Sequence, residues 1–471
     1  MPDPFTLSVI QAGFENAAEE MFAVLRKTAM SPIIYEVLDV GTGITDAQGR
    51  LVSSGAGIPT FVGVLDKAVK VIVERYGDTL QDGDIFITND PNHGGVTHLN
   101  DVVIAKPVFF DGHCVAFTAS IAHWGDIGGK VPGSMASDVT EIFAEGLRLP
   151  PVRLFDAGDQ NAAVFDIVQI NSRLPDFVRG DLWAQIAASK SAERQLLSLY
   201  EKYGMSIVAA AMSDAFASGR ARALAGLGTL PRGRFSINEE QDDGRMWHAK
   251  ITISDDTFEV DLTGNPSDDG TPYNTSRDGA VIACQMIFKA LCDPERFANF
   301  GSFSPLRVIT EDGTIFHAGP TAPQGYYFET RVRLFDMLWQ CMARAIPGRL
   351  PAGSFSSIFG TVIAGLHPDT GRKYTMVEPQ MGGWGATSAR DGLSAMFSPN
   401  HGDTFNCPVE ICEARYGLNV LEKALSARPL NTSGTSGGHG VSVTYEARAS
   451  ASLSVGYTRA KVPAWLSLIH I

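Results

Sequence analysis

Apolar and polar positions recur along the chain with two different periods, which predict a mixture of helices and strands. Apolar side chains fall at helical spacing between residues 7 and 28, and a second helix is expected near residues 62–76. Residues 35–54 are typical of two strands joined by a turn at 46–49, and another strand is expected at 84–88. We therefore expect a mixed sheet with accompanying helices in the first third of the chain.

A hairpin is predicted around the dipeptide Asp111-Gly112. Residues 101–110 and 113–122 form apolar, strand-like runs on either side of it, and Asp-Gly in that position is a strong hairpin signal. For a two-residue turn the numbers of facing residues sum to 223, so residue 101 should face 122 and residue 100 should face 123. The ends of the two strands far from the turn should then meet.

The pattern changes twice further along the chain. Residues 173–224 are rich in helical periodicity, and after Arg232 strands such as residues 256–262 alternate with helices such as residues 279–291. This order predicts an α/β fold with mixed α+β character and several domains. We expect an N-terminal metal-site region at 1–155, a helical segment at 156–230 and a C-terminal α/β domain at 231–471.

Composition narrows the class of protein. The 471 residues carry a formal charge of −14, which argues against binding to nucleic acid or to an anionic membrane, because both need clustered Lys and Arg. No apolar run approaches the roughly 18 residues that span a bilayer, and the first residues lack a signal-peptide pattern. Six cysteines are scattered without a CxxC pair, which is typical of reduced thiols. A soluble, cytoplasmic protein is expected.

The last six residues, LSLIHI, match the translation of a sequencing adapter. We therefore expect the natural part of the sequence to end near Trp465 and the gene to be truncated there.

Residues 89–129 hold the densest group of chemically active side chains. The group consists of Asp90, His93, His98, Asp101, His123 and Asp126. The predicted hairpin brings His98, Asp101, His123 and Asp126 to one place, and imidazole with carboxylate is a workable ligand set for zinc, manganese or iron. The alternative is a hydrogen-bonded structural cluster that fixes the hairpin. Asp90, in NDP before a glycine-rich loop, is expected to cap a turn.

Nucleotide-binding motifs are missing from the sequence. No GxxxxGK[ST] occurs, and neither 41–43 nor 382–386 completes GxGxxG after a strand. No GxSxG motif of a serine hydrolase occurs either. If this chain takes part in an ATP-driven reaction, another chain must bind the nucleotide.

Several long motifs in the same order resemble the hydantoinase B family. They include GDIFITNDPNHGGVTHLNDVVIAKPVF, AHWGDIGGKVPGSM, EIFAEGLRLPPVRL, VDLTGNPSDDGTPYN and NCPVEICEARY. The family is similar to the C-terminal half of 5-oxoprolinase and to the alpha-type subunits of acetone and acetophenone carboxylases. The resemblance covers about residues 4–465.

The resemblance implies a divalent metal held by His98, Asp101 and His123. It also implies a glutamate from the early strand region, for which Glu36 is the best match and Asp39 the second. Asp126 would then orient a ligand histidine or a substrate.

Other positions match family motifs without an implied role as ligands. Glu145 is a catalytic candidate, and Asn274, Asn406 and Glu410 could line a substrate pocket or simply cap turns and pair at interfaces. Trp124 departs from the histidine common in AHHADVGG, which would remove a polar group beside the metal.

The implied function is that of a B subunit in an ATP-dependent cyclic amidohydrolase. A partner A-type subunit would use ATP to activate a carbonyl substrate, and this chain would complete metal-assisted ring opening of a lactam or hydantoin. Two alternatives remain open: an alpha-type subunit of an acetone or acetophenone carboxylase, and a non-catalytic scaffold subunit. A non-heme iron oxygenase is a weaker rival.

Overall fold

The structure is a computed structural model that describes residues 3–295, 297–402, 404–426 and 434–465. The expectation about LSLIHI falls on residues 466–471 and lies outside the described residues. None of the helices in the described part of the chain combines the length and apolar character needed to span a membrane.

A seven-stranded sheet forms the centre of the N-terminal region, in the order β2-β1-β5-β4-β3-β6-β7. Its strands are β1 (Val40–Asp46), β2 (Leu51–Gly57), β3 (Ile85–Thr88), β4 (Asp101–Phe110), β5 (His113–His123), β6 (Val152–Asp156) and β7 (Asp159–Gln160). Every neighbouring pair is antiparallel. The prediction of a mixed sheet here is wrong in that detail, because short turns join β1 to β2 and β4 to β5, and such turns connect only antiparallel strands.

Helices cover both faces of this sheet. α3 (Pro59–Tyr76) packs on one face, and α1 (Pro4–Thr28) and α5 (Pro175–Tyr203) pack on the other. The alternation of side chains along β4 divides the two cores: Val103 and Ala105 belong to the core under α3, whereas Val102 and Ile104 belong to the core under α1 and α5. Short elements complete the region: α2 (Pro32–Tyr35), α4 (Ala162–Ile170) and the 3₁₀ turns Gly77–Thr79 and Ile142–Ala144.

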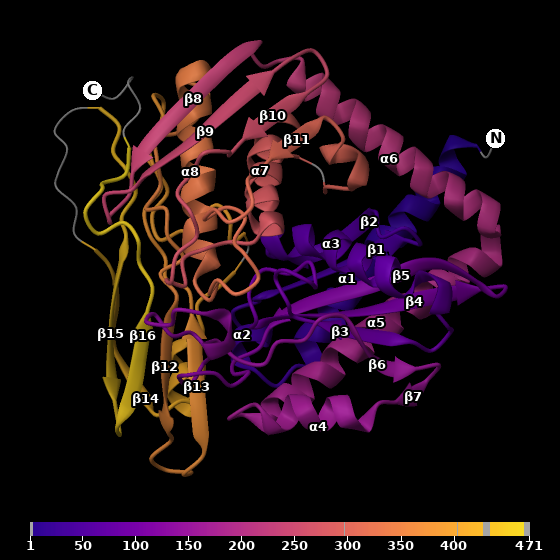
Figure 1. Ribbon diagram of the computed structural model, residues 1–471, viewed down its shortest axis with the longest axis horizontal. Coiled ribbons are helices and arrows are strands. Elements are labelled where there is room, and N and C mark those ends of the chain that lie inside the picture. Colours follow the sequence, from indigo (N-terminus) through magenta and orange to yellow (C-terminus); the bar gives the residue numbers. More distant parts are fainter. Residues whose placement is uncertain (1–2, 296, 403, 427–433, 466–471) are drawn as a thin grey trace.

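A second sheet, in the order β11-β10-β9-β8, follows the helical segment. Its strands are β8 (Gly233–Glu240), β9 (Met246–Ile253), β10 (Phe258–Asp261) and β11 (Leu306–Ile309), and β10 pairs with β11 in parallel. α6 (Met205–Leu227) links the two regions, because Val208 and Ala211 lie in the first core and Ala223 and Leu227 in the second (Figure 1). α7 (Arg277–Cys292) and the 3₁₀ turn Phe300–Phe303 lie in the same region.

The remaining strands lie along one side of the molecule, at the left of Figure 1. They form a three-stranded sheet, β13-β12-β16, and a two-stranded sheet, β14-β15. Their bounds are β12 (Thr361–Leu366), β13 (Lys373–Glu378), β14 (Leu418–Leu425), β15 (Val441–Ala447) and β16 (Ala451–Val455), with α9 (Val409–Arg415) before β14. The mixed α/β class predicted from the sequence is confirmed; the domain boundaries stay a prediction.

One long helix, α8 (Tyr327–Ala345), joins the cores and matters for the site. Its first turns place Tyr327 and Val332 in the N-terminal core, and its later turns place Leu334 and Leu338 in the core of the second sheet. Tyr327 and Arg331 are four residues apart, so they lie on one face of the helix. The helix therefore delivers both side chains to the same place.

The β4–β5 hairpin turns at Asp111 and Gly112 as predicted, but its register changes along the ribbon. Phe110 pairs with His113 and Phe109 with Cys114, which matches the predicted sum. A register shift follows, and from Val108↔Ala116 onward each pair sums to 224, so that Asp101 faces His123. The extra residue of a β-bulge accounts for this shift, which the turn alone could not reveal. The prediction that 101 faces 122 is therefore wrong by one position.

Candidate metal centre

Three predicted ligands meet at one end of the seven-stranded sheet. Asp101 begins β4, His123 ends β5, and His98 lies in the turn just before β4. Asp101 and His123 are direct partners across the two strands, and the Asp101 backbone N–H donates to the His98 carbonyl at 3.1 Å. One donor atom from each of the three residues lies within 4.8 Å of the others. The turn and the hairpin together thus produce the cluster.

Hydrogen bonds fix the orientation of two of these side chains. The Nδ1 of His98 lies 3.0 Å from the Gly325 carbonyl oxygen, which leaves Nε2 facing Asp101 Oδ1 at 3.2 Å. The Tyr327 hydroxyl donates to Asp101 Oδ2 at 3.2 Å, and the Thr97 hydroxyl donates to the same oxygen. These bonds hold Oδ2, so that the other oxygen of Asp101, Oδ1, faces His98.

The donor set fits a divalent metal ion. Among the described residues, neither Asp101 Oδ1 nor His123 Nδ1 has a hydrogen-bond partner, although both atoms are buried. The proximity of His98 Nε2 to Asp101 Oδ1 does not meet the geometry of a hydrogen bond. Buried polar atoms are almost always paired, and two imidazole nitrogens converging on a carboxylate oxygen form a common first shell for zinc, manganese or iron.

At Asp101 and His123, electrostatics favour the protonation states that a metal needs. Burial, reinforced by His98, lowers the pKa of His123 to about 3, so this imidazole is neutral at physiological pH. Burial tends to raise the pKa of Asp101, but His98 outweighs it, and the pKa is lowered. For His98 burial lowers the pKa while Asp101 raises it, and the net direction is upward. Ligation requires neutral imidazole and ionised carboxylate.

A small cavity of about 40 Å³ adjoins the three residues. By volume it has room for about two or three water molecules. Further polar groups in its wall are Asp39, Arg331 and His401. Burial and the nearby Asp101 raise the pKa of Asp39 well above its usual value, while burial and Arg331 lower the pKa of His401 to about 3.

Of the two acidic candidates for an additional ligand, the structure places Asp39 at the cavity and not Glu36. Asp39 is buried, and its backbone carbonyl accepts a hydrogen bond from the His123 N–H at 3.1 Å. Leu38, just before it, adopts a left-handed φ of 66°, which turns the chain between α2 and β1. Glu36 closes the C-terminal end of α2, is only half-buried and does not line the cavity.

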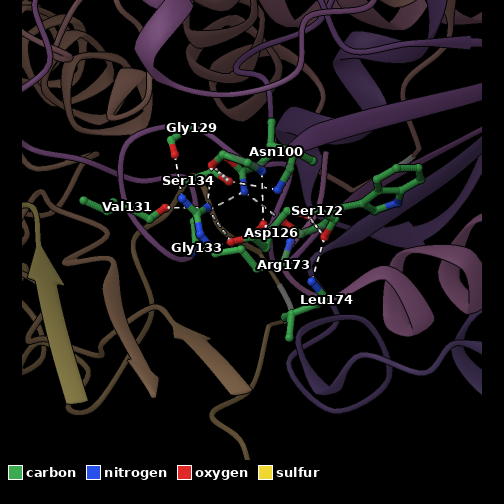
Figure 2. A network of polar contacts seen from close by, with 12 residues as sticks. Asn100, Asp126, Gly129, Val131, Gly133, Ser134, Ser172, Arg173 and Leu174 are labelled. Atoms are coloured by element: carbon green, nitrogen blue, oxygen red, sulfur yellow. Dashed lines mark hydrogen bonds and ion pairs between the residues drawn. The ribbon is translucent and has the colours of Figure 1, made fainter. Parts of the chain in front are cut away.

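Asp126 lies in a neighbouring loop network and is not brought into the cluster (Figure 2). Its carboxylate accepts hydrogen bonds from the backbone N–H groups of Gly128, Gly133 and Arg173 at 3.1, 2.9 and 2.8 Å. The Arg173 guanidinium adds an ion pair at 3.1 Å. These contacts hold the loop that follows β5, so Asp126 shapes the surroundings of the site from outside it.

Glu145 is connected to the cluster through the backbone of one residue, Gly325. Both of its oxygens accept from the Gln324 N–H, at 2.9 and 3.0 Å, and one accepts from the Gly325 N–H at 2.6 Å. The carbonyl of the same Gly325 contacts His98 Nδ1. A Cβ at Gly325 would lie 2.9 Å from the Glu145 carboxylate, so any side chain there would displace that carboxylate. Burial raises the pKa of Glu145 to about 7.

The remaining family-matched positions lie away from the cavity wall. Asn274 is buried and donates to the carbonyls of Asp269, Thr271 and Pro323 at 2.8, 2.8 and 3.1 Å, which is the role of a turn-holding residue. Asn406 donates to a backbone carbonyl at 2.8 Å.

Three further positions are exposed on the surface or cap a turn. Glu410 is exposed in the first turn of α9, and His93 is exposed as well. Asp90 caps its turn as expected, accepting from the N–H groups of Asn92 and His93 at 2.8 and 2.9 Å.

Trp124 corrects one expectation about the site. The ring belongs to the main core, and its Nε1–H donates to Gln185 Oε1 on α5 at 3.0 Å. It does not line the cavity beside His123. Because neighbouring residues of an extended chain point to opposite sides, Trp124 faces the core while His123 faces the site. A polar group is therefore not removed from the cavity by this tryptophan.

Sequence reasoning missed Tyr327, Arg331 and His401. Tyr327 and Arg331 come from α8, and His401 comes from the loop after residue 398, more than 200 residues from the histidine cluster. Their local sequence carries no ligand spacing that could have singled them out. Only the packing of α8 against the end of the sheet brings them to the cavity.

The comparisons with known proteins agree with one another. Residues 3–467 match the family Hydantoinase B/oxoprolinase. The B subunit of a putative D-/L-hydantoinase from Pseudomonas sp. (strain NS671) is 29% identical over 89% of this chain and 74% of its own.

Two solved structures are similar to this chain. The crystal structure of an ATP-dependent caprolactamase from Pseudomonas jessenii has a TM-score of 0.91 and 26% identity, covering 97% of this chain and 80% of that one. An acetone carboxylase has the same fold, with a TM-score of 0.86, 20% identity, and coverage of 94% and 62%. On the family match over nearly its whole length, the chain belongs to the hydantoinase B/oxoprolinase family.

Proposed function

We propose that this chain is the metal-bearing B subunit of an ATP-dependent enzyme that opens a cyclic amide, such as a lactam or hydantoin. The observation that carries the proposal is the convergence of His98, Asp101 and His123, with Asp101 Oδ1 and His123 Nδ1 buried and unpartnered among the described residues. The caprolactamase likeness supports a cyclic amide as the substrate class.

Each residue of the site has a proposed task. His98, Asp101 and His123 would hold manganese, zinc or iron, with Asp39 as a further oxygen donor in place of Glu36. A bound ion of this kind polarises a carbonyl and lowers the pKa of water. Gly325 accepts the Nδ1–H of His98 and thereby fixes the tautomer whose Nε2 is free to bind.

Hydrogen bonding and burial also determine which oxygen of Asp101 can bind a ligand and how strong the electrostatic interactions are. Asp101 Oδ2 receives the hydroxyls of Thr97 and Tyr327, so only Oδ1 is left for a ligand. The small buried cavity excludes bulk water, which strengthens every electrostatic interaction within it. Because a ring substrate exceeds a volume of about 40 Å³, we expect the cavity to open when substrate enters.

A partner chain is part of the proposal. The sequence contains no phosphate-binding motif, yet the similar caprolactamase is ATP-dependent, and the hydantoinase relative is one subunit of its enzyme. We propose that an A-type subunit uses ATP to activate the substrate carbonyl, and that this chain receives the activated species.

Reconstitution tests this function. The chain would be combined with a hydantoinase A-type subunit, and ATP-dependent opening of 5-oxoproline, hydantoin and caprolactam would be measured with and without bicarbonate. We expect bicarbonate-independent turnover that is lost in His98→Ala/His123→Ala. The control His93→Ala/His113→Ala changes two exposed histidines of the same region and should retain activity. Turnover that requires bicarbonate, or that survives in the first variant, would overturn the proposal.

A further inference from the structure

Arg331 is a buried cation without a role in the proposed reaction. It lies on α8, is 2% exposed and lines the same cavity as Asp39 and the histidines. Its Nη1 donates to the Thr60 hydroxyl, and the guanidinium carbon lies 5.6 Å from the centre of the Tyr327 ring. Within the described residues its Nε has no hydrogen-bond partner, and no carboxylate lies at ion-pair distance.

Two other buried arginines show the usual arrangement. Arg333, two residues further along α8, forms an ion pair with Glu239, and Arg459 contacts Asp336 at 2.9 Å. Within the described part of the chain, Arg331 lacks such a carboxylate and contacts only uncharged acceptors such as the Thr60 hydroxyl and the Asn400 carbonyl, so its buried charge is poorly compensated. Such a group at a cavity is a candidate for ligand binding.

With a divalent metal at the histidine cluster, the charges around the cavity would favour an anionic ligand. Arg331 contributes one positive charge, and Asp39 and Asp101 contribute two negative charges when both are ionised. A divalent metal at the histidine cluster would bring the sum to +1. One monoanion would then neutralise the site, and guanidinium is the side chain best suited to carboxylate and phosphoryl oxygens.

We infer that Arg331 is the receptor for an oxyanion carried by the reacting end of the substrate. The inference rests on the proposed function. Hydrolysis of a cyclic amide adds water across the C–N bond and leaves a carboxylate and an amine on one molecule, so the product carries such a group. A phosphoryl-activated substrate would carry one too. Both present oxygens that the unpartnered Nε can bind.

The surroundings of Arg331 also indicate where the rest of the molecule would lie. The Met286 sulfur is 3.8 Å from Arg331 Nη1 and 3.7 Å from the Thr60 hydroxyl. Met286 lines a second cavity, of about 620 Å³, whose wall includes Val62, Ile282, Phe335 and Trp339. Arg331 and Thr60, which line the cavity of the histidine cluster, therefore contact a residue in the wall of a larger, mainly apolar cavity. This arrangement suits an oxyanion attached to a hydrocarbon body.

Calorimetric titration tests the assignment without measuring turnover. Acetate, hexanoate and inorganic phosphate would be titrated into the metal-loaded chain, with metal content measured on the same samples. We expect Arg331→Gln to weaken binding of these anions at least tenfold with metal content unchanged, and Arg331→Lys to retain part of it. Arg277→Gln, at an exposed ion pair on α7, controls for the loss of one positive charge elsewhere.

The outcomes separate the two proposals. Anion affinity that is unchanged in Arg331→Gln, with metal retained, overturns this inference alone. A well-folded wild type without metal overturns the proposed function and the inference with it. If Arg331→Gln does not fold, a crystal structure of the metal-loaded wild type with phosphate decides, because an anion bound beyond hydrogen-bond reach of Arg331 contradicts the assignment.

Discussion

Replacing Glu145 by Gln tests whether the fold orients a proposed metal ligand, His98, through the backbone of Gly325. The carboxylate accepts the N–H groups of Gln324 and Gly325, and the Gly325 carbonyl holds His98 Nδ1 at 3.0 Å. A glutamine can keep the oxygen that accepts from both N–H groups, but it places an NH₂ group where the other oxygen faces the Gln324 N–H. Because two N–H donors then face each other, we expect the backbone at Gln324 and Gly325 to shift, and His98 loses its fixed position.

The size of the effect follows from two opposing contributions. Burial raises the pKa of Glu145 from 4.5 to about 7, so the ionised form is disfavoured by roughly 3 kcal/mol at about 1.4 kcal/mol for each pKa unit. Glutamine removes this cost, while a buried Gln324 N–H that faces an NH₂ group costs about 1–3 kcal/mol. The two nearly cancel at neutral pH, so we expect little change in Tm. Metal affinity should nevertheless fall by about 10–100-fold, as for other groups that orient a ligand.

Competition with a chelator measures that affinity, and Glu141→Gln, an exposed glutamate four residues earlier, is the matched control. An unchanged metal affinity in Glu145→Gln, with the control behaving like wild type, would refute the relay from Glu145 to His98. A collapse of Tm with intact affinity would show instead that Glu145 serves only to hold the loop.

Three further predictions concern single side chains. Burial raises the pKa of Asp181 to about 6 from 3.8, so its contribution to stability is present below about pH 4 and lost as the pH rises through 6. We expect Asp181→Asn to abolish roughly 3 kcal/mol of this pH dependence of the unfolding free energy, as measured by urea unfolding across this range. Trp124→Phe leaves Gln185 Oε1 buried without its donor and should cost about 1–3 kcal/mol of unfolding free energy while metal content stays constant; reduced metal content in a folded variant would contradict the placement of Trp124 in the core. Tyr327→Phe removes a hydroxyl from Asp101 Oδ2 and should weaken metal binding about tenfold in a chelator titration, whereas an unchanged affinity would deny Tyr327 a positioning role.

Much of the site's framework could be predicted from local sequence. The Asp111-Gly112 turn, the strands on either side and the spacing of His98 and Asp101 are short-range features, because a two-residue turn fixes which strand ends meet. The bulge moved the register by one position, and convergence survived because the ligands lie at the open end of the ribbon. His123 therefore faces Asp101 itself and not its neighbour.

What could not be predicted depends on long-range packing and on unusual backbone. The choice between Glu36 and Asp39 turns on the short helix α2 and the left-handed Leu38, neither of which has a clear pattern in the sequence. Arg331 and His401 reach the cavity only because α8 and a distant loop pack there. The orientation of Trp124, by contrast, could have been predicted from the alternation of an extended chain.

Elemental analysis of the purified chain tests the central claim most directly. The account predicts nearly one manganese, zinc or iron ion per wild-type chain, none in His98→Ala/His123→Ala, and an undiminished amount in His93→Ala/His113→Ala. A well-folded wild-type chain without metal, or equal metal in the first double variant, would contradict it and leave the histidine cluster as a structural element of the hairpin.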